Sequence, residues 1–406
     1  MKYVVVLADG MADERLADLG YKSPLEYAHT PYMDVLMPYS EVGLVNTIPE
    51  GCAKGSDTAN LAVLGYDPRK YYFGRSPLEA LSMGVTLKES DVTFRTNLVT
   101  LSEEASYEEK KILDHSSDEI TTEEASILIK AVQEAFGDQV KSFYPGISYR
   151  HLLVWEEGST KVKLTPPHDI LEQEIGHYKP QGDHSNEIWE MMKASYDLLN
   201  HHPVNEKRRA RGLKPANSIW IWGEGSKPHL PEFNKKYGVQ GAVISAVDLI
   251  KGIGIGAGMH SINVEGATGN MHTNYKGKAD AAIKALLEED YDFIYIHLEG
   301  PDECGHRGEM DNKILAIEQI DNKIIGPITQ ALENAGEDYK LLVLPDHPTP
   351  VRLRTHTGDP VPYMIYDSTC RKIENDKKLY NETYAKEKGN FIGKGYELME
   401  HFLKRK

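Results

Sequence analysis

The chain has 406 residues, of which 40% are hydrophobic and 27% are charged, and its formal net charge is −16. This length exceeds one simple hydrophobic core, so we expect two domains in a soluble globular protein. The negative charge argues against nucleic acid or an anionic membrane as the main partner, because both attract basic patches. No segment approaches the ~18 apolar residues of a membrane span, and the 3 cysteines lack a CxxC spacing. We therefore expect a cytoplasmic protein without disulfides.

The first hundred residues alternate short apolar runs with helix starts. Residues 3–8 form a continuous, β-branched run that is typical of a buried strand. Residues 41–47 resemble a second strand, and the partial alternation in 92–100 predicts a third that leads out of this region. Helix starts are predicted at Ser56 and Ser76.

The character of the sequence changes between residues 101 and 235. A capping box at 121–124 begins a predicted helix, and residues 143–155 predict a pair of strands interrupted by Pro and Gly. The motifs before and after this section belong together. We therefore interpret 101–235 as an inserted, smaller α+β domain, and residues 1–100 with 236–406 as one discontinuous core.

The alternation of strands and helices returns after residue 238. Strands are predicted at 241–247, 291–298, 341–344 and 361–366, and helices at 278–289 and 311–334. This order is typical of a mostly parallel sheet that is covered on both faces. A glycine-rich segment, 252–258, lacks the directly preceding strand of a dinucleotide-binding loop. We predict that it is a flexible loop and that no nicotinamide cofactor binds there.

Ser56 stands where a short helix is predicted to begin, and Gly65 and Pro68 are typical of that helix's end. The free N–H groups and the positive end of the dipole at a helix start favour an alkoxide or a phosphate. The alternative is an ordinary helix cap, since serine commonly takes that position. Ser56 becomes a candidate nucleophile only if other reactive groups surround it.

Three of the predicted strands are followed by an acidic residue, with histidines close by. These candidate ligands are, in chain order, Asp9; Asp302 with His306; Asp346 with His347; and His356. Ligands collect outside the carboxyl ends of parallel strands, so we expect these side chains to meet at one edge of the sheet. Each also has a structural explanation: an i,i+4 pair on a helix surface for Asp302 and His306, or a turn formed by the prolines around Asp346.

The combined set indicates metal-assisted phosphoryl transfer. Carboxylates and imidazoles together suit Mn²⁺ or Zn²⁺ better than Ca²⁺, and Mg²⁺ is a further candidate. Two such ions neutralise a phosphoryl group and lower the pKa of a serine hydroxyl, which is otherwise a weak nucleophile. The sequence therefore predicts transfer through a phosphoserine at Ser56.

Four motifs carry a resemblance to a known family: 6–10, 55–61, 301–306, and Asp346-His347 followed by His356-Thr357. They resemble the alkaline phosphatase superfamily and, more closely, the archaeal-type cofactor-independent phosphoglycerate mutases. The similarity extends through 202–208 and 215–217. It implies an αβα sandwich with a mostly parallel sheet and an inserted substrate-binding domain that closes as a lid. It also implies the interconversion of 3-phosphoglycerate and 2-phosphoglycerate without 2,3-bisphosphoglycerate.

The resemblance further implies two metal sites. Asp302, His306 and His356 would hold one ion, and Asp9, Asp346, His347 and the oxygen of Ser56 would hold the other. For the carboxylate and phosphate of a phosphoglycerate we expect arginines. The candidates in the insert are Arg150 beside His151, and Arg208 and Arg211 in a basic cluster, for which a solvated helix end is the alternative.

The insert departs from the mutase pattern at 219–223 and at 114–119, where this chain lacks arginines that the mutases carry. These differences resemble a bacterial branch of proposed homoserine kinases. Three hypotheses follow: a mutase, a kinase-like phosphotransferase acting on homoserine through the same serine and metals, and a binding protein without turnover. In the first two, the partner is a small phosphorylated or hydroxylated metabolite.

Overall fold

The computed structural model describes residues 1–370 and 379–404. Its contacts divide the chain into two compact units, which we call the core unit (Met1–Tyr72 with His229–Lys406) and the inserted unit (Phe73–Pro228). Within the described residues, no helix combines the length and the apolar character needed to cross a membrane.

The inserted unit begins earlier than the sequence suggested. Strand β3 (Asp91–Leu101), which we had assigned to the core, pairs on one side with β6 (Arg150–Glu156) and on the other with β9 (Ser218–Ser226). The unit therefore starts at residue 73 rather than 101, and it ends at 228 rather than 235. The physical reason is that β3 pairs with strands of the insert, which are Ile112–Asp114 as well as β6 and β9.

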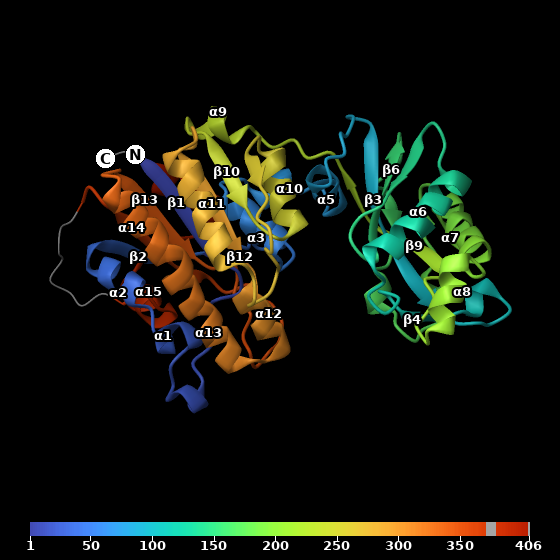
Figure 1. Ribbon diagram of the computed structural model, residues 1–406, viewed down its shortest axis with the longest axis horizontal. Coiled ribbons are helices and arrows are strands. Elements are labelled where there is room, and N and C mark those ends of the chain that lie inside the picture. Colours follow the sequence, from blue (N-terminus) through green and yellow to red (C-terminus); the bar gives the residue numbers. More distant parts are fainter. Residues whose placement is uncertain (371–378, 405–406) are drawn as a thin grey trace. The chain divides into compact units, whose positions relative to one another are not determined.

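The core unit contains an eight-stranded sheet in the order β11-β10-β12-β1-β13-β14-β2-β15 (Figure 1). The strands are β1 (Lys2–Ala8), β2 (Ser40–Val45), β10 (Gly241–Ile244), β11 (His260–Ile262), β12 (Phe293–Leu298), β13 (Tyr339–Leu344), β14 (Val361–Asp367) and β15 (Asn390–Ile392). The pairs at the centre, from β11 to β13, are parallel, and only β14 runs antiparallel to its neighbours β13 and β2. The predicted mostly parallel α/β sheet is confirmed.

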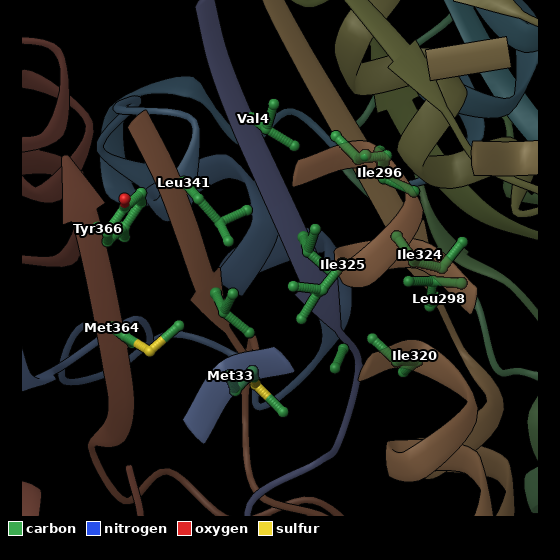
Figure 2. Packing of buried hydrophobic residues seen from close by; sticks show 14 of the residues in the cluster. Val4, Met33, Ile296, Leu298, Ile320, Ile324, Ile325, Leu341, Met364 and Tyr366 are labelled. Carbon is green, nitrogen blue, oxygen red and sulfur yellow. The ribbon is translucent and has the colours of Figure 1, made fainter. Parts of the chain in front are cut away.

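Helices cover both faces of this sheet. They are α1 (Pro24–Tyr27), α2 (Pro31–Leu36), α3 (Ser56–Val63), α4 (Pro68–Tyr71), α9 (Phe233–Tyr237), α10 (Asp248–Gly256), α11 (Tyr275–Leu287), α12 (Gly300–Arg307), α13 (Met310–Ile320), α14 (Gly326–Asn334), α15 (Glu382–Lys388) and α16 (Leu398–Leu403). On one face, Val4, Ile296 and Leu341 pack against Ile320 and Ile324 (Figure 2). On the other face, Tyr3 meets Phe402 of α16 edge to face. This is the αβα sandwich expected from the resemblance.

The glycine-rich segment 252–258 is not the loop that we predicted, because residues 252–256 lie within α10. A Cβ on Gly254 would come within 2.5 Å of Val243 Cγ1 in β10. The missing side chain therefore lets the helix approach the sheet closely, and it serves packing rather than cofactor binding. The predicted helix 311–334 is present as α13 and α14, joined by a π-helical turn at Asp321–Ile325.

The inserted unit is a smaller α+β structure. Its main sheet has the order β4-β3-β6-β5, β9 also pairs with β3, and β7 pairs with β8 in a small separate sheet. Its remaining elements are β4 (Ile112–Asp114), β5 (Lys141–Tyr144), β7 (Val162–Lys163), β8 (Gln181–Gly182), α5 (Ser76–Ser82), α6 (Thr122–Phe136), α7 (Ser185–Leu199) and α8 (Pro203–Ala210). The predicted cap at 121–124 is present, since the Glu124 backbone N–H donates to Thr121 Oγ1. Buried apolar residues of α6 and α7 pack on one face of the sheet.

Candidate metal centre

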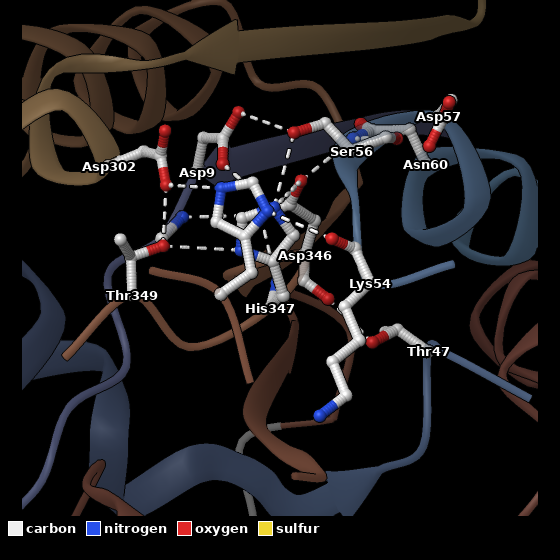
Figure 3. Close-up of polar contacts among 12 residues, drawn as sticks. Asp9, Thr47, Lys54, Ser56, Asp57, Asn60, Asp302, Asp346, His347 and Thr349 are labelled. Carbon is white, nitrogen blue, oxygen red and sulfur yellow. Dashed lines mark hydrogen bonds and ion pairs between the residues drawn. The ribbon is translucent and has the colours of Figure 1, made fainter. Parts of the chain in front are cut away.

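Strand register brings the predicted ligands to one edge of the core sheet. In β1, Ala8 lies beside Leu298 of β12, and Leu7 lies beside Leu344 of β13. Because these strands are parallel, the residues that follow them leave the sheet at the same level. Asp9, Asp302 and Asp346 consequently face one another across a short distance (Figure 3).

Ser56 is the first residue of α3, as predicted, and its hydroxyl faces this edge. Its Oγ lies 3.2 Å from Nε2 of His347 and 3.4 Å from Oδ2 of Asp9 (Figure 3). Asn60, one turn later, donates through Nδ2 to the Ser56 backbone oxygen and to Asp346 Oδ2, at 2.9 and 3.0 Å. Asn60 thus links the start of α3 to the Asp346 carboxylate by hydrogen bonds.

Asp9, Asp346 and His347 form what we call the inner group. Their exposed fractions are 1%, 0% and 0%, and His347 Nε2 lies 3.6 Å from Asp9 Oδ1 and 3.5 Å from Asp346 Oδ2. Burial, followed by the charges of Asp346 and Asp302, raises the pKa of Asp9 well above its usual value. Asp9 Oδ1 accepts no hydrogen bond from any described residue. A buried, unsatisfied carboxylate oxygen among like charges is the environment that a cation stabilises.

Asp302, His306 and His356 form the outer group. Nε2 of His306 lies 3.3 Å from Asp302 Oδ2, and Nε2 of His356 lies 3.4 Å from Asp302 Oδ1. Burial would raise the pKa of Asp302, but its hydrogen bonds with the two histidines outweigh burial and lower it. Thr349 Oγ1 also donates to Asp302 Oδ1.

The tautomers of the two outer histidines follow from their other ring nitrogens. Nδ1 of His306 lies 3.1 Å from the Arg354 carbonyl oxygen, and Nδ1 of His356 lies 3.0 Å from that of Lys54. A carbonyl oxygen only accepts, so both Nδ1 atoms carry a proton. The hydrogen bond from Nε2 to Asp302 belongs to the protonated ring, whereas the neutral ring presents a lone pair at Nε2. These Nε2 atoms lie 2.8 Å apart. Two lone pairs facing each other at that distance fit a cation held jointly by the rings and Asp302.

The two groups overlap more than the sequence suggested. Within residues 1–370 and 379–404, three sets of side chains have ligand atoms within 4.8 Å of one another, close enough to share one metal ion: Asp302, His347 and His356; Asp9, His297 and Asp346; and Asp9, Glu299 and Asp302. His347, expected only in the inner group, stacks on His356 with ring centroids 3.9 Å apart. His347 therefore contacts residues of both the inner and the outer group.

The sequence analysis missed His297, which supports the inner group from β12. Its Nε2 lies 2.9 Å from Asp9 Oδ2, and its Nδ1 lies 3.3 Å from Ser245 Oγ. Burial lowers the pKa of His297 to about 4, so the ring is neutral at neutral pH. The available signal was a single histidine inside the otherwise apolar strand Phe293–Leu298.

A buried ammonium group joins the loops that carry the ligands. Lys313 Nζ donates to Asp13 Oδ2 at 2.7 Å and to the Thr349 carbonyl oxygen at 2.9 Å. Lys313 and Asp13 are an ion pair with fully buried side chains. This pair fixes the loop after β1 to the loop after β13, and so holds Asp9 and Asp346 in register.

The four residues expected to bind substrate all lie in the inserted unit. Arg208 is 2% exposed and donates to Glu124 Oε2 and to the carbonyl oxygens of Ser117 and Lys214. Arg211 is exposed and also pairs with Glu124. The basic cluster therefore joins α8 to α6, and protein acceptors take up the Arg208 guanidinium.

The remaining two expected residues are neighbours in β6. His151 is buried and accepts a hydrogen bond at Nδ1 from the Gly146 N–H, and burial lowers its pKa to about 3. Arg150 is exposed, with its guanidinium carbon 5.5 Å from the ring centroid of Tyr149. Of the four, Arg150 has the open guanidinium that an anionic ligand needs.

A family model and full-length relatives of this chain carry the same family description. The family model for 2,3-bisphosphoglycerate-independent phosphoglycerate mutase matches residues 39–205. A probable 2,3-bisphosphoglycerate-independent phosphoglycerate mutase of Geobacter sulfurreducens is 46% identical, with 100% of both chains covered. The corresponding mutase of Methanosarcina barkeri is also 46% identical over 100% of both chains.

Two solved structures share the whole fold. A Pyrococcus horikoshii protein has a TM-score of 0.81 and 30% identity, covering 100% of this chain and 98% of that one. The cofactor-independent phosphoglycerate mutase of Thermoplasma acidophilum has a TM-score of 0.67 and 24% identity, with 99% of both chains covered, and supports the fold alone. The full-length relatives confirm the resemblance found in the sequence motifs. The chain belongs to the 2,3-bisphosphoglycerate-independent phosphoglycerate mutase family.

Proposed function

We propose that this protein interconverts 3-phosphoglycerate and 2-phosphoglycerate by phosphoryl transfer through Ser56. The observation that carries the proposal is the position of the Ser56 hydroxyl, 3.2 Å from His347 Nε2 and 3.4 Å from Asp9 Oδ2. The names of the full-length relatives support the same reaction. Family membership further supports a cycle in which the phosphoryl group remains on the enzyme and no 2,3-bisphosphoglycerate is needed.

In this proposal the inner and outer groups each hold one divalent ion, Mn²⁺ or Zn²⁺ according to the mixed carboxylate and imidazole donors. Ions bound there supply positive charge that neutralises the phosphoryl group and lowers the pKa of the Ser56 hydroxyl. Asn60 orients Ser56 through its bond to the serine backbone. The N–H groups at the start of α3 provide donors for phosphoryl oxygens.

Two transfers complete the proposed reaction. Ser56 Oγ first attacks phosphorus, and the bond to the substrate oxygen breaks, which leaves glycerate and phosphoserine. The neighbouring hydroxyl of glycerate then attacks the same phosphorus, and the bond to Ser56 breaks. We propose that the inserted unit binds the glycerate between these steps, and that excluding water protects the phosphoserine from hydrolysis.

The comparisons favour the mutase over the homoserine kinase-like alternative, because both curated relatives described above carry the mutase name. The orphaned oxygen of Asp9 and the paired Nε2 atoms of the outer histidines favour a working metal centre over a binding protein without turnover.

The test is an assay of purified protein supplied with Mn²⁺, with either 3-phosphoglycerate alone or homoserine with ATP. We expect 2-phosphoglycerate to form in the first arm without added 2,3-bisphosphoglycerate. The variant Ser56→Ala should form no phosphoenzyme and no product, whereas Ser126→Ala, on α6 of the inserted unit, should retain activity. Wild-type turnover by Ser56→Ala, or phosphorylation of homoserine in place of mutase activity, would contradict the proposal.

A further inference from the structure

Thr349 lies in the loop after β13 and is buried beside both the inner and the outer group (Figure 3). Its backbone is held from two directions, since its N–H donates to the Ala12 carbonyl oxygen at 3.3 Å and its carbonyl oxygen accepts from Lys313 Nζ at 2.9 Å. A Cβ on Gly10 would lie 2.6 Å from Thr349 Oγ1. The loop after β1 therefore lies directly against the hydroxyl, and the surrounding backbone sets the position of that hydroxyl.

The Thr349 hydroxyl contacts one ligand of each group. Its Oγ1 donates to Oδ1 of Asp302, which belongs to the outer group. The same Oγ1 lies 3.3 Å from Nδ1 of His347, which belongs to the inner group. No other described residue forms a hydrogen bond with this ring nitrogen. The hydrogen-bonding role of Nδ1 therefore depends on Thr349.

A hydroxyl has one proton, so the two contacts of Thr349 differ in direction. At neutral pH a carboxylate has no proton and only accepts, so the Thr349 proton points to Asp302. A lone pair of Oγ1 then faces His347, and this second contact is a hydrogen bond only when Nδ1 carries the proton of the ring. A neutral imidazole has a single N–H, which leaves Nε2 with a lone pair. The hydroxyl thus selects one of the two tautomers of His347.

The selected tautomer directs the lone pair of His347 Nε2 into the inner group. This atom lies 3.2 Å from Ser56 Oγ, 3.6 Å from Asp9 Oδ1 and 3.5 Å from Asp346 Oδ2. An imidazole binds a metal ion through a nitrogen that has no proton. In the other tautomer, Nε2 would carry a proton in this position and could not bind an ion.

We propose that Thr349 is a positioning residue that keeps the proton of His347 on Nδ1 and so presents Nε2 to an ion in the inner group. The inference rests on the proposed function, in which this group holds a divalent ion. It also connects the two groups, because Asp302 orients the Thr349 hydroxyl. A ligand of the outer group thereby determines which nitrogen of an inner ligand is protonated. Removing a group that orients a metal ligand in this way typically lowers metal affinity by about 10- to 100-fold.

The tautomer can be measured directly by nitrogen NMR of the metal-free, full-length protein with isotopically labelled histidine. Protonated and unprotonated ring nitrogens have well-separated resonances, and the spectrum of His347→Gln assigns those of His347 among the 16 histidines. We expect the wild type to show a protonated Nδ1 and an unprotonated Nε2 at His347. This measurement needs no substitution at Thr349, so it decides the proposal even if a variant at that position fails to fold.

Two variants separate the hydroxyl of Thr349 from its packing. Thr349→Val keeps the shape and removes the hydroxyl, whereas Thr349→Ser keeps the hydroxyl and removes a methyl group. Titration with Mn²⁺ alone, followed by the electron paramagnetic resonance of the free ion, measures affinity without turnover. We expect Thr349→Val to bind Mn²⁺ about 10- to 100-fold more weakly and to lose the preference for the Nδ1-protonated tautomer. Thr349→Ser should match the wild type in both measurements. A role in packing alone predicts the reverse order, because valine fills the site and serine leaves a cavity.

Thr329→Val is the matched control. It makes the same change at a buried threonine of α14, whose Oγ1 donates to the Ile325 carbonyl oxygen at 2.8 Å. It should leave the tautomer of His347 and the affinity for Mn²⁺ unchanged.

Three results would overturn the inference: a protonated Nε2 at His347 in the wild type, unchanged affinity in Thr349→Val, or equal losses in Thr349→Val and Thr349→Ser. A different result would overturn the proposed function alone. In that case the wild type would show the expected tautomer and Thr349-dependent binding of Mn²⁺, but no mutase activity.

Discussion

The inner and outer ligand groups use the same residue types in different surroundings. The side chains of Asp9, Asp346 and His347 are at most 1% exposed, whereas those of Asp302, His306 and His356 are 10%, 38% and 21% exposed. Asp9 directly follows β1, and Asp346 lies two residues after the end of β13. The outer residues stand on α12 and on the loop before β14. An ion in the inner group would be enclosed by protein, while one in the outer group would remain within reach of water.

The difference also appears in the electrostatics of the two carboxylates at the centre of each group. Burial and neighbouring acids raise the pKa of Asp9, whereas hydrogen bonds with two histidines overcome burial and lower that of Asp302. The outer carboxylate thus has its compensating partners within the protein. The inner carboxylate lacks them and depends more strongly on a bound cation.

The largest effect is expected from the inner group. Asp346→Asn preserves the shape of a side chain that accepts from the N–H groups of Gly10 and His347, but it removes the charge. A bound ion contributes several kcal/mol to such a reaction, so turnover should fall by more than about 1,000-fold. Metal analysis of the purified variant should show less bound ion, and added Mn²⁺ should not restore activity. Asp280→Asn, on the exposed side of α11, is the control and should behave as wild type.

A smaller and reversible effect is expected from the outer group. His306→Ala removes one donor from a site that water can enter, so affinity for the ion should fall by about 10- to 100-fold. Activity measured against metal concentration should return towards the wild-type value at high Mn²⁺. If excess metal fails to rescue His306→Ala, or rescues Asp346→Asn equally well, the distinction between an enclosed and an open site is wrong.

The smallest effect concerns stability in the metal-free protein, where pH should act with opposite signs on two histidines: His297, which contacts the inner group, and His306 of the outer group. The folded-state pKa of His297 is about 4, below the ordinary 6.5, so protonation favours the unfolded chain as pH falls from 6.5 towards 4. Between pH 7 and 5 this costs about 2 kcal/mol. The pKa of His306 is raised, first by its hydrogen bond with Asp302. Its contribution is therefore present below pH 6.5 and is lost as pH rises through the folded-state pKa.

Urea unfolding of the metal-free, full-length protein at pH 7 and pH 5 checks these signs. His297→Gln should lose less stability than the wild type on acidification, and His306→Gln should lose more. Equal acid sensitivity of the two variants would show that the two histidines do not differ in the way that their burial and partners indicate.

The boundary of the inserted unit shows how much depended on one strand assignment. Residues 92–100 were correctly predicted as a strand, but they were assigned to the core. Apart from the short β4, the partners of β3 begin at Arg150 and Ser218. A local pattern of apolar residues predicts that a strand exists, but it contains no information about a partner that distant in the chain.

The sequence by itself determined the α/β architecture, the helix start at Ser56 and the acids and histidines that gather at the sheet edge. It could do so because strand-end positions and helix caps leave local signals, and parallel strands place their ends together. Tertiary structure decided the rest. His297 is hidden in an apolar strand, Gly254 serves a close contact with β10, and protein acceptors fill the guanidinium group of Arg208. These properties depend on side chains brought together from distant segments, so residue type and spacing alone do not reveal them.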